Sequence, residues 1–320
     1  MKKLFKNKKQ LKNRKYCNKI NEGNKIYFNY WKYISISFII LFYLIQKKLK
    51  NLNLENINLK VCICTPAKEE NKYAKEYITH YKNYGVDKIY LYDNNNINGE
   101  HFEEVINEFI KSGFVEIVNF RGKKRALFDM MNDCYKKNYL KYDWLIFYEF
   151  DEYIHLKNKT IKTFLGDKRF NRCQTIKLNW ILHTDNNLIY YDNRTLKERF
   201  PVVEKKDKKE KLVKSILKGG IPNIKISCPH RLDLKLKSCN GYGKRTNNKA
   251  TINDIDYENY YIDHYSCKST EEFAKKLNKG DAMYLNDNIF ERLKAYFDYN
   301  EITKEKIDYF DRYIPFFNTY

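Results

Sequence analysis

The sequence lacks several features that mark common protein classes. Its eight cysteines have no spacing typical of metal ligands, and no segment repeats along the chain, so neither a cysteine-bound metal nor a repeat architecture is expected. Acids are scarce at the start, where residues 1–50 hold 14 lysines and arginines but one acid, Glu22. Much of the formal net charge of +21 therefore lies in a tail. Nucleic-acid binders usually carry a basic stripe on the folded domain, so nucleic acid is not expected as a partner.

Residues 26–46 form a long apolar run with one charged residue, Lys32. The run is about the length needed to cross roughly 30 Å of hydrocarbon, and no small-residue cleavage site follows it. Ten lysines and arginines precede Tyr30 and three lysines follow the run, which places the N-terminus in the cytoplasm. We expect a retained single-pass membrane anchor. The alternative is an amphipathic or buried helix of the domain.

The expected organisation is a basic cytoplasmic tail (1–25), the anchor (26–46), a polar linker (47–59) and one domain (60–320). In a eukaryote this domain would lie in a Golgi-like lumen. Cys62 and Cys64 alternate with apolar residues, which is typical of a buried strand. Cys228 and Cys239 could pair if the compartment is oxidising.

Strand patterns alternate with helix patterns over the first part of this domain. Strands are expected over 58–66 (ending at Pro66), 86–96, 114–120 and 142–156, and helices over 71–85, 100–113 and 124–140. This alternation predicts an α/β fold with a mostly parallel sheet covered by helices on both faces. Further on, we expect a strand over 173–183, a charged loop that becomes helical over 204–218, and a short strand followed by a capped helix over 259–280.

Polar clusters follow three of these strands: TPAKEE (65–70), YDNNN (92–96) and EFDE (149–152). Ligands of open α/β sheets bind at the carboxyl ends of strands. On a strand, Glu149 and Asp151 would point to the same side, about 6–7 Å apart. Mg²⁺ or Mn²⁺ would relieve their repulsion and also suits substrate phosphates. The alternative is a solvated acidic strand end.

Several segments resemble glycosyltransferase family 92 and related family 2-like enzymes of the GT-A fold. Lys68–Asn96 resembles the opening block of that family, WLIFYEFDEYI (144–154) its metal-binding segment, and His264–Gly280 its late block. Residues 196–200 and 214–216 match weaker blocks. The resemblance implies a GT-A-type domain.

The resemblance also implies roles for single residues. The donor nucleotide would contact four of them: Thr65, Glu70, Asp93 and Lys268. The metal would be bound by Asp151, with Glu149 in place of the usual first aspartate and with His264 as a further ligand. His264 could instead be a hydrogen-bonded strand histidine, and Lys268 one more lysine in a lysine-rich chain.

On the acceptor side, transfer with inversion needs a general base near the acceptor hydroxyl. Asp185 is the candidate, although it could be an ordinary turn residue. Trp180 could stack on a sugar or belong to the core, and His230 is a further candidate for the acceptor cleft. Arg199 would suit a phosphate group, with a surface ion pair to Glu198 or a neighbour as the alternative.

These observations predict a Mn²⁺- or Mg²⁺-dependent glycosyltransferase that moves a sugar from a UDP-sugar to a glycan hydroxyl. Inversion, and galactose as the sugar, are implied by the resemblance alone. One alternative is a catalytically inactive, membrane-tethered glycan-binding protein of the same fold. Another is a basic protein that binds polyanions or nucleic acid through its tail.

Overall fold

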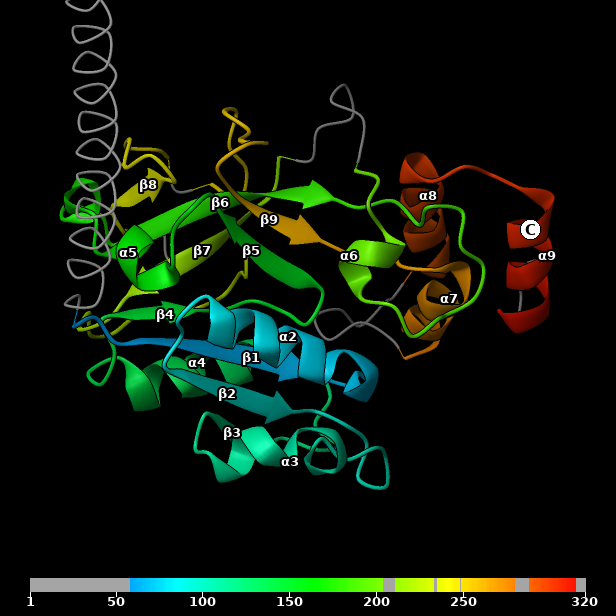
Figure 1. The fold of residues 1–320 in the computed structure, drawn as a ribbon, viewed down its shortest axis with the longest axis horizontal. Helices are drawn as coiled ribbons and strands as arrows, with labels where there is room; N and C mark the ends of the chain where they lie inside the picture. The colour runs from blue at the N-terminus through cyan, green and yellow to red at the C-terminus, as the bar shows by residue number, and fades with distance from the viewer. Residues whose placement is uncertain (1–57, 204–210, 233–234, 248, 280–287, 315–320) are drawn as a thin grey trace, which may run out of the picture. The chain divides into compact units, whose positions relative to one another are not determined.

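The computed structural model describes residues 58–203, 211–232, 235–247, 249–279 and 288–314 (Figure 1). These residues belong to one compact unit that begins at Asn58. The expected tail and anchor lie outside the described residues. Within the described ranges, no helix has the length and apolar character needed to span a bilayer.

The first half is the expected alternating α/β pattern. Strands β1 (Val61–Ala67), β2 (Lys88–Asp93), β3 (Val115–Asn119) and β4 (Trp144–Ile146) pair in parallel in the order β3-β2-β1-β4. Helices α2 (Asn71–Asn83), α3 (Glu103–Lys111) and α4 (Leu127–Asn138) connect them, as Figure 1 shows. The predicted order of strands and helices is confirmed from β1 to α4.

Alternation along β1 explains why helices cover both faces of the sheet. Val61 and Ile63 pack with α2 and α3, whereas Cys62 and Cys64 pack with α4. The strand runs through Pro66 and does not stop there. Ala67 O accepts from Asn94 N on the β2 side, so the nitrogen of Pro66 faces β4. The ladder with β4 has already ended at Ile63, and the missing N–H therefore costs no ladder hydrogen bond.

The second half of the sheet is mixed. Strand β7 (Val213–Lys218) lies antiparallel between β4 and β6 (Thr175–Leu182), and β9 (Tyr260–His264) is parallel to β6. Strand β5 (Glu152–Leu156) is antiparallel to β9, and β8 (Ser238–Asn240) is parallel to β6. The helix expected toward residue 218 is wrong, because residues 213–217 are fully enclosed within the sheet. The charged residues 204–210 lie outside the described residues.

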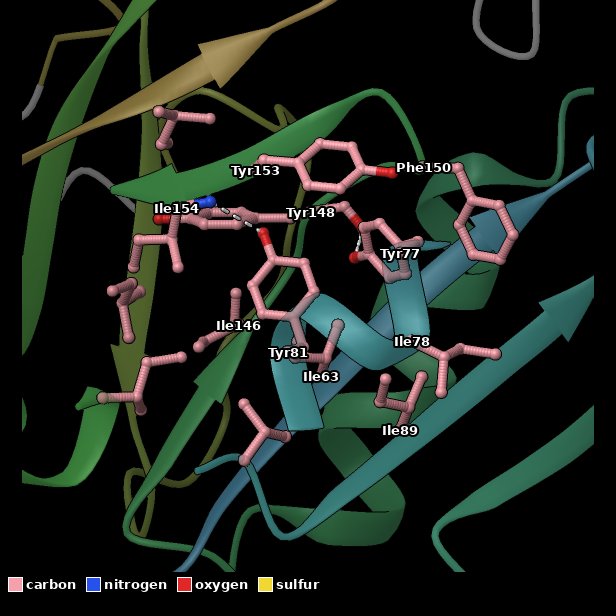
Figure 2. Close-up of a cluster of buried hydrophobic side chains, with 14 of the residues drawn as sticks. Ile63, Tyr77, Ile78, Tyr81, Ile89, Ile146, Tyr148, Phe150, Tyr153 and Ile154 are labelled. Carbon is pink, nitrogen blue, oxygen red and sulfur yellow. Dashed lines mark hydrogen bonds between the residues drawn. The ribbon is translucent and has the colours of Figure 1, made fainter. Parts of the chain in front are cut away.

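The strand expected over 142–156 is broken in two. Strand β4 ends at Ile146, β5 begins at Glu152, and residues 147–151 form a connector between them. Helix α2 holds this connector (Figure 2): Tyr77 donates to Tyr148 O (3.1 Å) and its ring stacks on Phe150. Tyr81 donates to Glu152 O (2.7 Å). Glu149 and Asp151 are therefore not two residues of one strand, as the sequence predicted.

Helices α7 (Thr270–Asn278), α8 (Ile289–Tyr299) and α9 (Lys304–Tyr313) form a separate cluster with its own apolar core. Helix α7 has the predicted cap: Ser269 accepts from Glu272 N and Glu272 reaches back to Ser269 N. Helices α8 and α9 were not predicted. The remaining helical elements of the described residues are short: α5 (Ile161–Leu165), α6 (Leu196–Arg199) and a 3₁₀ turn (Lys168–Phe170).

Two disulfides link elements that are distant in sequence. Cys64 of β1 bonds Cys134 of α4, and Cys173 bonds Cys239 of β8. The suggested Cys228–Cys239 pair is wrong, since Cys228 is a free thiol. Cys62 is a buried free thiol, as expected for a core residue.

Candidate functional site

A pocket of about 780 Å³ opens between the loop after β1 and helix α7. The loop contributes Lys68, Glu69 and Glu70, which belong to the first polar cluster of the sequence. Its walls carry more cations than acids; the lysines are Lys68, Lys72, Lys268, Lys275, Lys276 and Lys279, and the acids are Glu69, Glu70, Glu100 and Glu272. Such a lining suits an anionic ligand. We call it the lysine pocket.

Both loops that border the lysine pocket contain a non-glycine residue in the left-handed region, Glu69 and Lys268, each with φ of 54°. This conformation is uncommon for such residues and clusters at functional sites. Lys268 is only 5% exposed, and its Nζ lies 3.9 Å from the ring centre of Tyr73. Burial lowers the pKa of Lys268 to about 8.

Asp151 lies directly beside the lysine pocket. Its Oδ2 accepts from Lys276 Nζ (2.9 Å), and its Oδ1 lies 3.7 Å from His264 Nε2. Burial alone would raise the pKa of Asp151, but Lys276 and His264 outweigh it and hold that pKa well below its usual range. Asp151 is therefore an anion at neutral pH, and Lys276 joins it to the pocket.

Glu149 points to a different partner. Its Oε1 lies 2.6 Å from the ammonium of Lys214, a residue of β7 whose side chain is 1% exposed. Lys214 also lies 3.1 Å from Oε1 of the buried Glu152. Burial raises the pKa of Glu152 to about 8 despite this lysine, whereas Lys214 outweighs burial and lowers the pKa of Glu149. The side chain of Glu149 is 45% exposed, so its carboxylate reaches solvent.

Aromatic side chains surround these carboxylates. The ring of Trp180 lies 4.0 Å from that of His264 and 4.9 Å from that of His230. Lys214 Nζ lies 5.8 Å from the Trp180 ring centre, which places Trp180 in the Glu149 neighbourhood. Burial lowers the pKa of His230 to about 4, so this ring is neutral at pH 7. The structure thus brings together Glu149, Asp151, Trp180, His230 and His264.

The three side chains predicted as metal ligands do not converge on one point. Asp151 Oδ2 and Glu149 Oε1 each meet a lysine ammonium, and these lysines belong to different elements, α7 and β7. Across the described ranges, no group of three or more histidine, cysteine, aspartate or glutamate side chains is arranged to hold a metal ion. Among the described residues these side chains therefore do not form a preassembled ligand set, and a divalent cation bound here would take most of its ligands from water and phosphate oxygens.

The predicted nucleotide contacts are in different environments. Glu70 lines the lysine pocket, with its Oε1 3.6 Å from Lys279 Nζ. Thr65 is fully buried in β1. Asp93 is 2% exposed and pairs with Arg121 (2.6 Å), which also donates to Asn96 O, so this carboxylate organises the loop after β2. A nucleotide contact by Thr65 or Asp93 stays a prediction.

Two further candidates lie in interior networks. Asp185 is 1% exposed and meets Lys306 Nζ of α9 at 2.6 Å, so it joins the loop after β6 to the C-terminal helices. A carboxylate so enclosed lacks the access that a general base requires. Arg199 is also 1% exposed and pairs with Glu272 (2.6 Å). The alternative of an ion pair holds for Arg199, although the pair is buried and not on the surface.

Sequence reasoning missed Lys214 and Lys276 as site residues. Lys214 stood in one of the weak family blocks, and Lys276 in the predicted capped helix. Neither has a sequence signal that separates it from the many other lysines. Their role follows from ion pairs between segments that are distant in sequence. Lys214 is 65 residues from Glu149, and Lys276 is 125 residues from Asp151.

The chain is similar to one protein family and to several solved structures. Residues 57–286 match the model of glycosyltransferase family 92, and no curated protein matches the chain. Among solved structures, S. aureus TarS has a TM-score of 0.37 and 10% identity, covering 78% of this chain and 47% of that one. This chain therefore spans about half the length of that TarS chain.

Two other structures are similar at the same level. S. aureus TarS 1-349 in complex with UDP-GlcNAc has a TM-score of 0.34 and 11% identity over 80% of both chains. A putative glucose-1-phosphate thymidylyltransferase from Bacillus anthracis in complex with a sucrose has a TM-score of 0.27 and 12% identity, over 50% of this chain and 69% of that one. No residue role follows from likeness at these values.

Proposed function

Because the chain belongs to glycosyltransferase family 92, we propose that it transfers a sugar from a UDP-sugar to a hydroxyl group of a glycan. The observation that carries this proposal is the lysine pocket beside Asp151. The pocket has the volume for a nucleotide and an excess of cations for a diphosphate. A UDP-sugar donor also agrees with the UDP-GlcNAc complex of TarS 1-349.

The two sides of the site suit the two substrates. The diphosphate would lie against Lys268 and Lys276, which face the lysine pocket. The acceptor would lie near Trp180 and His230, where an aromatic ring can stack on a sugar face. Asp151 stands between them through its contact with Lys276.

In the transfer, the bond between the anomeric carbon and the diphosphate oxygen breaks, and its electron pair leaves with UDP. The acceptor oxygen forms the new bond to that carbon, and its proton passes to a base. Fixed positive charge beside the departing diphosphate stabilises the transition state. Inversion at the anomeric carbon and galactose as the transferred sugar are part of the proposal and rest on the family.

Glu149 is the carboxylate that we assign as this base, in place of Asp185. Its side chain is 45% exposed and lies in the Trp180 neighbourhood, while Lys214 holds one of its oxygens. The pKa of Glu149 is lowered, so the carboxylate is ionised at neutral pH and can accept a proton. Asp185 has no comparable access.

The test is UDP release from a panel of UDP-sugars with glycan acceptors, followed by product analysis. Transfer of one sugar is expected. Glu149→Gln should lower kcat by about 10²–10⁴-fold with little change in UDP affinity, since general bases contribute about this much. Lys294→Ala, on an exposed position of α8, is the control. Donor binding without UDP release from any sugar would favour the inactive glycan-binding alternative.

The location of the enzyme is also a proposal. We propose that residues 26–46 anchor the chain with the N-terminus in the cytoplasm and the catalytic domain in an oxidising lumen. The two disulfides support such a compartment, because disulfides are rare in reducing cytosol. Protease protection of the domain in sealed microsomes, lost on detergent addition, would test this topology.

A further inference from the structure

The negative charges next to the lysine pocket already have counter-ions. Asp151 meets Lys276 at 2.9 Å and Glu149 meets Lys214 at 2.6 Å. A divalent ion at this point would have to displace ammonium groups that are held by the fold. Lys214 is buried in the sheet, and Lys276 also donates to Ser266 O (3.4 Å). The carboxylates therefore orient the lysines, and a metal ion bound at the same oxygens would have to break these ion pairs.

Lys268 is in the opposite situation. It is 95% buried, and no carboxylate of the described residues lies within 4.0 Å of its Nζ. Its Nζ lies 3.9 Å from the centre of the Tyr73 ring, while Asp151 and Glu70 act on it from beyond ion-pair distance. A buried cation without a close counter-ion is costly unless a ligand supplies the negative charge. Lys268 lines the lysine pocket together with Lys276, so that ligand would sit against both ammonium groups.

The geometry points to a diphosphate bound by Lys268 and Lys276 directly, without a divalent cation, so that donor binding is metal-independent. This inference rests on the proposed function and replaces the Mn²⁺ or Mg²⁺ expected from the sequence. Lysine is a common ligand of phosphate groups and acts there as a point charge. The two lysines would also take the charge that develops on UDP as the sugar leaves.

The two lysines differ in what holds them. Asp151 fixes Lys276, whose side chain is 31% exposed, whereas Lys268 is placed by its left-handed backbone and the Tyr73 ring. Asp151 is then a positioning residue, which acts on the diphosphate through Lys276. Asp151→Asn should therefore weaken UDP binding less than Lys276→Ala does.

The experiment is calorimetric titration of UDP into the full-length protein, once in EDTA and once in Mn²⁺. The expected dissociation constants agree within about threefold. In EDTA, Lys268→Ala and Lys276→Ala should each weaken UDP binding about tenfold or more, as for a lost hydrogen bond to a charged group. Lys294→Ala should bind as the wild type does, and unfolding midpoints verify that each variant is folded.

Each outcome decides one of the two claims. UDP binding that requires Mn²⁺, or that survives both lysine substitutions in EDTA, would overturn the inference and leave the proposed function standing. If the wild type bound UDP neither in EDTA nor in Mn²⁺, the proposed function would instead be refuted. The wild-type comparison does not depend on the folding of any variant.

Discussion

The hydroxyl of Tyr77, on helix α2, donates to the carbonyl of Tyr148 in the connector between β4 and β5. Both tyrosines are fully buried, and the Tyr77 ring stacks on Phe150 in the same connector, with ring centres 4.6 Å apart (Figure 2). The connector also carries Glu149 and Asp151. A core helix therefore determines where the acidic side chains of the site stand.

This relationship predicts the effect of Tyr77→Phe. The ring stays in place, but a buried carbonyl loses its donor, so the free energy of unfolding should fall by about 1–2 kcal/mol. Urea unfolding measures this change. Tyr190→Phe, at a side chain that is 59% exposed, should have almost no effect. If both variants matched the wild type, the tyrosine would not hold the connector.

The Arg199–Glu272 pair predicts how stability depends on pH. Burial would raise the pKa of Glu272, but Arg199 outweighs it and leaves the pKa at about 2, below the ordinary 4.5. The folded state thus binds this proton less readily than the unfolded state does. The stabilisation is complete above about pH 4.5 and is lost as the pH falls toward 2, with a size of about 3 kcal/mol.

Glu272→Gln tests this prediction. The variant should be less stable at neutral pH and should lose less stability than the wild type between pH 4.5 and 2, as measured by urea unfolding at several pH values. Glu258→Gln, at an exposed position, serves as the control. If the free energy of unfolding of Glu272→Gln fell between pH 4.5 and 2 as steeply as that of the wild type, another group would cause the loss of stability in acid.

Lys214 should be costly to remove. Lys214→Met leaves Glu149 and the buried Glu152 without their cation, and breaking one side of a buried ion pair costs about 3–5 kcal/mol. Lys214→Met/Glu149→Gln should recover part of this loss, because the ionised partner of Lys214 has been removed as well. Lys218→Met, at the end of the same strand, provides the comparison. Equal unfolding energies for Lys214→Met and the wild type would contradict the pairing.

The disulfides should contribute much of the stability. Each closes a long segment, so its loss should lower the free energy of unfolding by about 2–5 kcal/mol. Reduction of the wild type should therefore lower its melting temperature strongly. Cys228→Ala should respond to reduction as the wild type does, because Cys228 is a free thiol. Mass analysis after alkylation without reductant should find four cysteines of the described residues protected.

The sequence predicted the parts of the fold that depend on local pattern. The apolar face of α2 includes Tyr77, Ile78 and Tyr81, and this spacing identifies a helix before any contact is known. The local pattern gave a wrong prediction at residues 142–156, where a continuous aromatic run is compatible with one long strand. The break after Ile146 depends on hydrogen bonds from α2, which no local pattern contains.

The site was predictable to the same extent. Glu149, Asp151, Trp180, His230 and His264 were named from their positions after strands and from the family resemblance, and the structure places them together. Asp185 follows a strand in the same way, yet Lys306 of α9 encloses it. Position along a strand cannot reveal which lysine will reach a carboxylate, because that depends on how distant segments pack.

The two disulfides have a mechanical consequence when the chain is stretched from its ends. Cys64 and Cys134 are 70 residues apart in sequence, and Cys173 and Cys239 are 66 apart. Neither segment can lengthen when the chain is stretched from its termini, whereas free polypeptide extends by about 3.5 Å per residue. Tension applied to the chain ends would pass through the disulfide bonds and would not pull on strands β2, β3, β6 and β7, which all lie inside these covalent loops.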